Sequence, residues 1–532
     1  MVFFNKYIYS ALLSSALLTL AGCGSGSGGN TPPQPTASPS ATPTPTPPPR
    51  EDPLFDGQWY LENTGQTAGA QNGGTAGEDI DVVDVWKEFR GSKANAIAVV
   101  DVGVEATHPD LKDNLDLNLS YRYSDGSHDP SPTSKYLPHG TAVAGIIAAK
   151  GWNGIGIRGV APNAKLVGLN VLSAPTEANF IDAIGRAGIA VSSNSWGFSD
   201  NGLNEFETLV DTMQAGTQNG RNGKGTIYLF AAGNSRYKSN NSNTNTSSLT
   251  NNPYSIAVAA VNAKGHYASY SNYGSTVLVA GTGGEDSKEN PAIVTTDLTG
   301  LDQGYDTKNI HYDVPGNGNG DYTNRMNGTS AACPSVAGVT ALMLDANPNL
   351  TWRDVRYILA ATARKNDVQD GNWTTNGAGL HINYNYGFGM VDAFNAVEMS
   401  KTFEGLPEEK TYEVSKNTQG KIAQDSKTPL ISSLYVSSDI KVEFVDIWVT
   451  IEDKKGFRHI GDLEIILTSP EGTESVLAWG GVYTYGAYTD WRFGTVRHMD
   501  ENAQGTWKLS IRDVDGGSDY TLTHWKLKIY GH

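Results

Sequence analysis

Hydrophobic residues follow two different patterns along the chain, and the change between them falls near residue 400. From Glu51 to about Ser400, short unbroken apolar runs at 96–100 and 227–231 alternate with stretches at 141–149 and 335–346 that are apolar nearly all round. The short runs are typical of parallel strands buried on both faces, and the longer stretches are typical of helices packed inside a domain. Residues 51–400 are therefore predicted to form an α/β domain with a parallel sheet flanked by helices.

Beyond about Leu406, apolar residues recur at every second position. The alternating sets are Leu463, Ile465 and Leu467, then Trp507, Leu509 and Ile511, then Trp525, Leu527 and Ile529. Turn-forming clusters at 469–472 and 515–517 lie between them. Residues 401–532 are predicted to form a small all-β sandwich or jelly roll. Because no Gly/Pro-rich spacer stands near residues 400–410, we expect this unit to pack against the first.

The first fifty residues predict export and attachment. Residues 1–23 have a positive start and an apolar run that ends at Leu20, as in a secretory signal. The sequence Leu-Ala-Gly before Cys23 resembles a bacterial lipobox, and lipid on Cys23 would anchor the protein without a transmembrane helix. The alternative is an ordinary signal peptide with an incidental cysteine. Residues 24–50 are rich in Gly and Ser and then in Pro and Thr, which predicts an extended linker. We expect an exported protein of the bacterial cell envelope, at the outer membrane or the cell surface.

Composition narrows the function further. The 39 Lys and Arg against 56 Asp and Glu give a net charge of -17. Such a surface repels phosphate, which argues against nucleic-acid binding and favours calcium or basic substrates. The two cysteines, Cys23 and Cys333, exclude a disulfide framework and a thiolate zinc cluster. Cys333 lies one turn inside a predicted helix and is interpreted as a small packing residue.

Four polar residues stand where predicted strands end or predicted helices begin. Asp101 and Asn234 follow the runs 96–100 and 227–231, at the carboxyl ends of strands where sites form in α/β sheets. His139 and Ser330 each begin an apolar helix, whose N-terminus offers unpaired N–H groups. Pro334 is expected in the first turn of the second helix, where its missing N–H costs nothing. A serine nucleophile needs a base, an acid that fixes the tautomer of the base, and an oxyanion donor; these four residue types supply the roles. The order Asp, His, Ser is that of the subtilisin arrangement.

Five motifs in order resemble the subtilisin-like serine proteases: Val99-Val100-Asp101, His139-Gly140-Thr141, Ser195-Trp196-Gly197, Ala232-Gly233-Asn234 and Gly328-Thr329-Ser330. The segments 58–61 and 347–355 resemble the kexin/furin branch, and 461–463, 467–473 and 505–507 are similar to the P domain of those convertases. The resemblance implies a subtilisin-like sheet followed by a jelly-roll P domain. It also implies a serine endopeptidase whose triad is Asp101, His139 and Ser330, with Asn234 in the oxyanion hole.

The resemblance places four substrate-binding residues, the last of them at the floor of a pocket for a basic side chain: Ser195, Trp196, Gly197 and Asp200. Elsewhere the chain departs from the convertases. Val102 stands where they carry an acid, and Ser173 and the region near Ser247 lack the expected carboxylates. We therefore expect protein or peptide substrates to be cut after basic residues, without a strict requirement for a second basic residue.

The resemblance also implies a calcium site, formed by the side chains of Asp52, Asp110 and Asn153 and the backbone carbonyls of Lys150, Ile155 and Ile157. Glycines at 151, 154 and 156 allow this loop to turn its carbonyls inward, and hard oxygen ligands suit Ca²⁺. The alternative is a solvated acidic surface with an Asx turn. Asp125 and Asp129 form a weaker candidate for a second site.

Two functional classes remain open, a lipid-anchored endopeptidase and an inactive surface binding protein built on a protease scaffold. The intact set of four site residues favours the enzyme, since an unused triad need not be retained. Relatives in this family are usually made with a folded propeptide, but residues 24–50 have no hydrophobic core and cannot template a sheet. Parallel sheets fold slowly. We expect either that a separately encoded periplasmic chaperone assists folding or that the P domain suffices.

Overall fold

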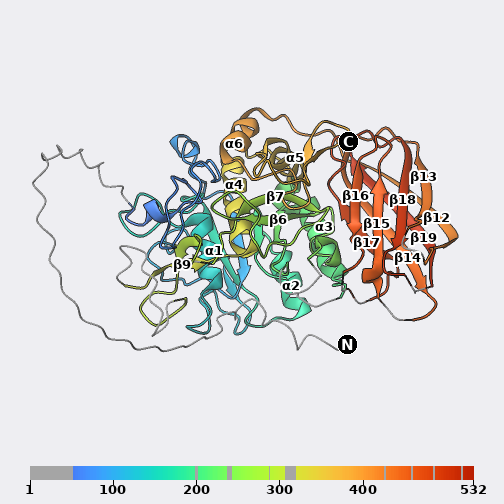
Figure 1. Ribbon diagram of the computed structural model, residues 1–532. Coiled ribbons are helices and arrows are strands. Elements are labelled where there is room, and N and C mark those ends of the chain that lie inside the picture. The colour runs from blue at the N-terminus through green and yellow to red at the C-terminus, as the bar shows by residue number, and fades with distance from the viewer. Residues whose placement is uncertain are drawn as a thin grey trace, which may run out of the picture.

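The computed structural model describes residues 52–532, apart from 198–201, 237–241, 287, 306–318, 425–426, 457–458, 483, 485 and 517–518. The predictions for the signal, Cys23, the linker 24–50 and Asp200 lie outside these residues. The described chain forms an α/β unit and a β-sandwich that pack side by side (Figure 1). Among these residues, no helix is both long and apolar enough to cross a membrane.

Seven parallel strands make the central sheet of the α/β unit, in the order β2-β3-β1-β4-β5-β6-β7. Alternate residues of β1 serve opposite faces: Ala98 and Val100 belong to one apolar cluster, and Ile97 and Val99 to another. Helices α1, α4 and α6 pack on one face and α2 and α3 on the other. The strands are β1 Ala96–Asp101, β2 Tyr121–Arg122, β3 Lys165–Asn170, β4 Val191–Asn194, β5 Ile227–Ala231, β6 Ser255–Val261 and β7 Val277–Thr282.

The helices of this unit are α1 His139–Ala148, α2 Glu177–Ile184, α3 Glu207–Gly223, α4 Thr329–Ala346, α5 Trp352–Thr362 and α6 Ala393–Thr402. Two short antiparallel pairs accompany the sheet, β8 Ile293–Thr296 with β9 Tyr322–Met326 and β10 Thr374–Thr375 with β11 His381–Ile382.

Helix α4 crosses the core and is buried from Thr329 to Leu344. The prediction that Pro334 lies in its first turn is wrong, because the helix begins at Thr329 and Pro334 is its sixth residue. A proline at this position cannot donate to the carbonyl four residues before it, which is that of Ser330. That carbonyl instead accepts a hydrogen bond from Ser195 Oγ at 2.9 Å. The proline thus frees an oxygen that ties α4 to the end of β4.

Two four-stranded sheets form the second unit, in the orders β12-β19-β14-β17 and β13-β18-β15-β16. Its strands are β12 Lys410–Lys421, β13 Leu430–Val436, β14 Val442–Asp453, β15 Leu463–Thr468, β16 Glu474–Ala478, β17 Trp491–Thr495, β18 Gly505–Asp513 and β19 Tyr520–Gly531. The alternating apolar residues of β15, β18 and β19 point inward and include the buried Trp507 and Trp525. The prediction of an α/β sheet followed by a β-sandwich is therefore confirmed.

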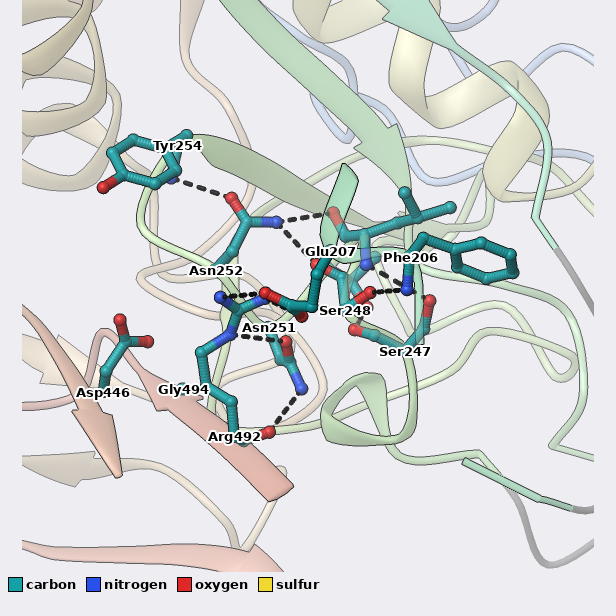
Figure 2. A network of polar contacts seen from close by, with 12 residues as sticks. Phe206, Glu207, Ser247, Ser248, Asn251, Asn252, Tyr254, Asp446, Arg492 and Gly494 are labelled. Atoms are coloured by element: carbon teal, nitrogen blue, oxygen red, sulfur yellow. Dashed lines mark hydrogen bonds and ion pairs between the residues drawn. The ribbon is translucent and has the colours of Figure 1, made fainter. Parts of the chain in front are cut away.

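The joint between the two units is continuous in both packing and hydrogen bonding. Phe444 and Val496 of the sandwich join the apolar cluster of the α/β unit. Arg492 of β17 makes a bidentate ion pair with Glu207 of α3, at 2.9 and 3.1 Å, and its carbonyl accepts from Asn251 Nδ2 at 2.7 Å (Figure 2). The expected packing of the two units is observed, and we call these contacts the seam.

The seam also binds main chain directly. Asn245 accepts from the Gly494 N–H at 2.7 Å and donates to the Gly494 carbonyl at 3.2 Å, while Ser275 Oγ donates to the same carbonyl at 2.8 Å. A Cβ at Gly494 would lie 2.6 Å from the Asn251 carbonyl and 2.6 Å from the Phe444 ring. Only glycine fits this contact without movement of its neighbours.

Candidate active site

Asp101 and His139 meet at the carboxyl end of the sheet. Asp101 is the last residue of β1 and His139 the first of α1. His139 Nδ1 lies 2.9 Å from both carboxylate oxygens of Asp101. Burial works to lower the pKa of His139, but the charge of Asp101 and its hydrogen bond prevail and raise that pKa above its ordinary value. With Nδ1–H donated to Asp101, the neutral ring leaves Nε2 as a base.

Ser330 is the second residue of α4 and lies at its N-terminus. Its Oγ donates to the Ser195 carbonyl at 3.2 Å, and in this conformation it makes no hydrogen bond to His139. The Ser330 N–H has no acceptor within the described chain, as expected for the first turn of a helix. A hydroxyl group and a free N–H donor thus belong to one residue.

The side-chain amide of Asn234 has a fixed orientation. Its Oδ1 accepts from both the N–H and the hydroxyl of Thr329, each at 2.9 Å, which leaves the Nδ2 hydrogens for another acceptor. A Cβ built on Gly328 would lie 3.2 Å from Asn234 Nδ2 and 3.5 Å from Ser330 N. The two donors therefore border the same space, and it is open because Gly328, at φ 104°, has no side chain.

Two features of this site were not predicted from the sequence: the free Ser330 N–H beside Asn234, and Thr329 as the residue that orients Asn234. A signal for the first was present, since the N–H groups of a first helical turn have no partner in the helix. The contact of Thr329 with Asn234 joins residues 95 positions apart and left no pattern in the sequence.

Of the sequence-predicted substrate-binding residues that are described, Ser195 contacts Ser330, and Trp196 and Gly197 follow it in the chain. Ser195 makes a reciprocal pair of hydrogen bonds with Ser330, each hydroxyl donating to the carbonyl of the other residue. The Trp196 ring packs against Phe180 at 4.6 Å and Phe230 at 5.5 Å between centroids. A Cβ at Gly197 would meet no atom within 4 Å, so this segment faces open space.

The side chains proposed for calcium meet at the loop after α1. Asp52 accepts from the N–H groups of Trp152, Asn153 and Gly154, and it is paired with the Arg158 guanidinium. Asp110 accepts from Asn153 Nδ2 at 2.7 Å, from the Ile157 N–H at 3.0 Å and from the Tyr322 hydroxyl at 2.9 Å. Burial raises the pKa of Asp110 to about 6. Asp110 is therefore a buried carboxylate held by neutral donors only.

These residues fit a hard cation in most respects. The carbonyls of Lys150, Ile155 and Ile157, the three predicted ligands, accept no hydrogen bond from the described residues. A Cβ at Gly156 would lie 2.2 Å from Asp110 Oδ2, so glycine is what allows the loop to approach this carboxylate. Asn153 and Asp52 are the exceptions. The Oδ1 of Asn153 accepts from the Ile155 N–H and would have to turn toward an ion. The Asp52 carboxylate already accepts from three N–H groups, and Arg158 compensates its charge.

Two other sequence predictions have a clear structural outcome. Arg122 lies between the carboxylates of the second candidate metal site, 3.1 Å from Asp125 and 3.7 Å from Asp129, and already compensates their charge. Cys333 is fully buried, and burial raises the pKa of its thiol to about 12. It remains a protonated packing residue, as predicted. No group of three or more His, Cys, Asp or Glu side chains in the described ranges is placed to hold a metal ion.

Comparison with known proteins agrees with this geometry. Residues 92–389 match the model of the subtilase family, and residues 446–529 match that of the proprotein convertase P-domain. The α/β sheet, the polar residues at its carboxyl edge and this match define a serine protease. The chain belongs to the subtilase family.

Relatives span almost the whole described chain. The Aeromonas extracellular serine protease of Aeromonas sobria is 32% identical over 90% of this chain and 91% of its own. The dibasic-processing endoprotease of Schizosaccharomyces pombe is 32% identical over 90% of this chain and 65% of its own. The crystal structure of the Aeromonas sobria serine protease in complex with the chaperone ORF2 matches with a TM-score of 0.84 and 29% identity, over 91% of this chain and 96% of that one.

Proposed function

We propose that this serine protease is an endopeptidase in which Ser330 is the nucleophile, His139 the general base and Asp101 the residue that orients it. The observation that carries the proposal is the placement of His139 Nδ1 at 2.9 Å from both oxygens of the buried Asp101 carboxylate. This contact fixes the tautomer that leaves Nε2 unprotonated. The chain has all four side chains that the mechanism needs, those of Asp101, His139, Ser330 and Asn234. This favours an active enzyme over a binding protein on the same scaffold.

In this mechanism Ser330 Oγ leaves the Ser195 carbonyl and attacks the scissile carbon while His139 Nε2 takes its proton. The oxyanion forms in the space beside Gly328, where the Ser330 N–H and Asn234 Nδ2 donate to it. His139 then gives the proton to the leaving amine, and the acyl group stays on Ser330. Water, deprotonated by His139, releases the acyl group and restores the enzyme.

Asn234→Ala is expected to lower kcat by about 10²–10³-fold, or roughly 3–4 kcal/mol, with little effect on KM, because it deletes one oxyanion donor. Asn234→Asp keeps the shape without the donor and should lose at least as much. Steady-state kinetics on a peptide amide give the readout. A parental kcat in either folded variant would show that Asn234 does not contact the oxyanion.

We propose that cleavage follows Lys or Arg, through Asp200 in the pocket that Ser195, Trp196 and Gly197 border. The relative named as a dibasic-processing endoprotease supports a basic preference. Val102, half-buried beside Asp101, offers no charge to a second basic residue. The substrate residue immediately before this Lys or Arg should therefore affect the rate of cleavage less than it does in a strict dibasic enzyme.

Asp200→Asn is expected to reduce kcat/KM for peptides with Arg at the cleavage site by roughly 10–100-fold, the worth of one hydrogen bond to a charged group. Peptides with Leu there should be unaffected. Asp211→Asn, an exposed acid on α3, is the matched control. Library profiling that gave a preference for large apolar residues in the parent, unchanged in the variant, would refute the assignment.

We propose that Ca²⁺ binds between Asp110, Asn153, Asp52 and the carbonyls of Lys150, Ile155 and Ile157. Bound calcium would neutralise the buried Asp110 and stabilise the loop after α1, and so hold His139 indirectly through its helix. The three loop carbonyls without hydrogen-bond donors support the site.

Calcium at 100 times its Kd should stabilise the folded protein by about 2.7 kcal/mol and raise Tm, and chelator should reverse the shift. Asp110→Asn should abolish most of the calcium-dependent shift. Asp113→Asn, an exposed acid three residues along the same turn, should keep it. Identical melting curves with calcium and with chelator in the parent would contradict the proposal.

We propose that the protein is exported and anchored through lipid on Cys23, and that a separate chaperone assists its folding. The lipobox-like sequence before Cys23 supports the first proposal, and the chaperone-bound structure of the Aeromonas sobria protease supports the second. The protein or peptide substrates would then be met at the cell envelope or outside the cell.

A further inference from the structure

A hollow of about 580 Å³ opens where the two units meet, beside the loop that carries Asn234. The α/β unit supplies most of its wall, from residues 236, 266–273 and 367–385, and the sandwich supplies Trp479. Its volume is that of a pocket for several side chains rather than a gap in packing. None of the roles proposed above uses it.

The walls of this hollow are fixed before any ligand binds. The Arg236 guanidinium lies between two tyrosine rings, 4.3 Å from the centroid of Tyr267 and 4.7 Å from that of Tyr273. Its Nη2 donates to Asn385 Oδ1 at 2.7 Å. Trp479 makes edge contacts with Tyr273 at 4.9 Å and, across the hollow's rim, with another tyrosine, Tyr384, at 5.1 Å. Because these side chains are already ordered, a ligand that binds here loses little free energy to their conformational entropy.

The wall of the hollow is connected directly to the loop that carries Asn234, both along the chain and by hydrogen bonds. Arg236 is the second residue after Asn234 in the chain. Asn272, which precedes Tyr273, accepts from the Ser235 N–H at 2.8 Å and donates its own N–H to the Gly233 carbonyl at 2.9 Å. A peptide bound at Ser330 and continuing past Asn234 therefore reaches Tyr273 and Arg236 next.

The strand order gives the direction of that peptide. Ser195 follows β4, Asn234 follows β5, and the 266–273 segment follows β6, and these strands are neighbours in that order. A substrate with its acyl side along Ser195–Gly197 and its scissile carbonyl on Asn234 therefore has its leaving-group side over the end of β6. The hollow lies at that end.

We infer that the hollow is a subsite for the part of a polypeptide substrate that follows the scissile bond, and that Trp479 of the sandwich takes part in binding it. The inference rests on the proposed function, because it takes Ser330 and Asn234 as the reacting centre. It makes the enzyme selective for polypeptides that extend several residues beyond the cleaved bond.

The charge of the lining favours one type of side chain. Asp367 and Asp370 stand against the guanidinium of Arg236 and the imidazole of His266, which lies 3.3 Å from Asp367. Tyrosine and tryptophan rings share the rest of the wall with neutral amide side chains. Aromatic faces and carboxylates attract a cationic side chain and repel an acidic one. A Lys in the extension should bind better than a Glu at the same position.

The test compares two peptides that share the acyl side and the first residue after the scissile bond. One ends there as an amide, and the other continues for five more residues that include a Lys. In the parent, kcat/KM for the long peptide is expected to exceed that for the short one by about tenfold or more, mainly through KM. A Glu in place of the Lys should lose most of this gain.

Two variants should bring the long-to-short ratio close to one. Trp479→Ala removes the part of the wall that the sandwich supplies. Gly371→Phe fills the hollow, and because a Cβ at this position meets no atom within 4 Å, the substitution disturbs no buried contact. Trp448→Ala, a half-buried tryptophan of β14 outside the hollow, is the matched control and should keep the parental ratio. A ratio near one in the parent, or a parental ratio in Gly371→Phe, would overturn the subsite. Failure of the parent to cut either peptide would instead count against the proposed function.

Discussion

Ser330→Ala should lower kcat by roughly 10⁶-fold, about 8 kcal/mol in activation free energy, and leave KM nearly unchanged. The substitution removes the attacking oxygen but keeps the peptide-binding segment and both oxyanion donors. His139→Ala should cost about as much, since the hydroxyl then has no base. The double variant should lose little more than either single one, because the two residues act in one step.

Ser335→Ala is the matched control for this series. Its hydroxyl lies in the same helix but donates to the Ala332 carbonyl, away from the site. Activity and Tm of each variant should be measured together, so that a loss of rate in a folded protein is separated from a loss of fold. Parental turnover in a folded Ser330→Ala protein would eliminate the covalent mechanism.

Asp101→Asn should lower kcat by about 10⁴-fold while the fold is kept. The amide offers N–H rather than oxygen to His139 Nδ1, so the imidazole adopts the tautomer with its proton on Nε2 and loses its function as a base. Asp129→Asn, an exposed acid on another loop, is expected to have parental activity.

The pH profile of Asp101→Asn provides an independent readout. In the parent, Asp101 holds the pKa of His139 above its ordinary value, so activity should fall as pH drops through that raised pKa and the base becomes protonated. Without the carboxylate, the cationic form of His139 is less stable, and its pKa falls. The acid limb of the residual activity should therefore move to lower pH. An unchanged limb would mean that His139 does not govern it.

Much of the fold follows from local patterns. Unbroken apolar runs such as 96–100 predicted strands buried on both faces. Ala98 and Val99 belong to different apolar clusters on opposite faces of the sheet, which explains why this run shows no alternation of apolar and polar residues. The ends of these elements predicted where Asp101, His139 and Ser330 would lie. The start of α4 was predicted to within one residue, but Pro334 was placed in the first turn, whereas a helix that begins at Thr329 puts it in the second.

Contacts between distant segments could not be predicted in this way. Arg492 and Glu207 are 285 positions apart, and each alone resembles an ordinary exposed charge. The space beside Gly328 depends on Asn234, which Thr329 orients from the first turn of α4. The hollow at Trp479 needs both units in place. Such features arise from the packing of finished elements, which leaves no periodicity in the sequence.

The seam at Gly494 has a consequence for how this protein can change over generations. Asn245 and Ser275 bind the N–H and the carbonyl of Gly494, which are main-chain groups, and the fit at this residue demands the absence of a side chain. A sandwich that keeps this glycine, the path of β17, the Arg492–Glu207 pair and the packing of Phe444 and Val496 can alter its surface away from the seam and still dock. The contact at Gly494 thus depends on backbone geometry, and the surfaces of the two units away from it are free to change toward new substrates.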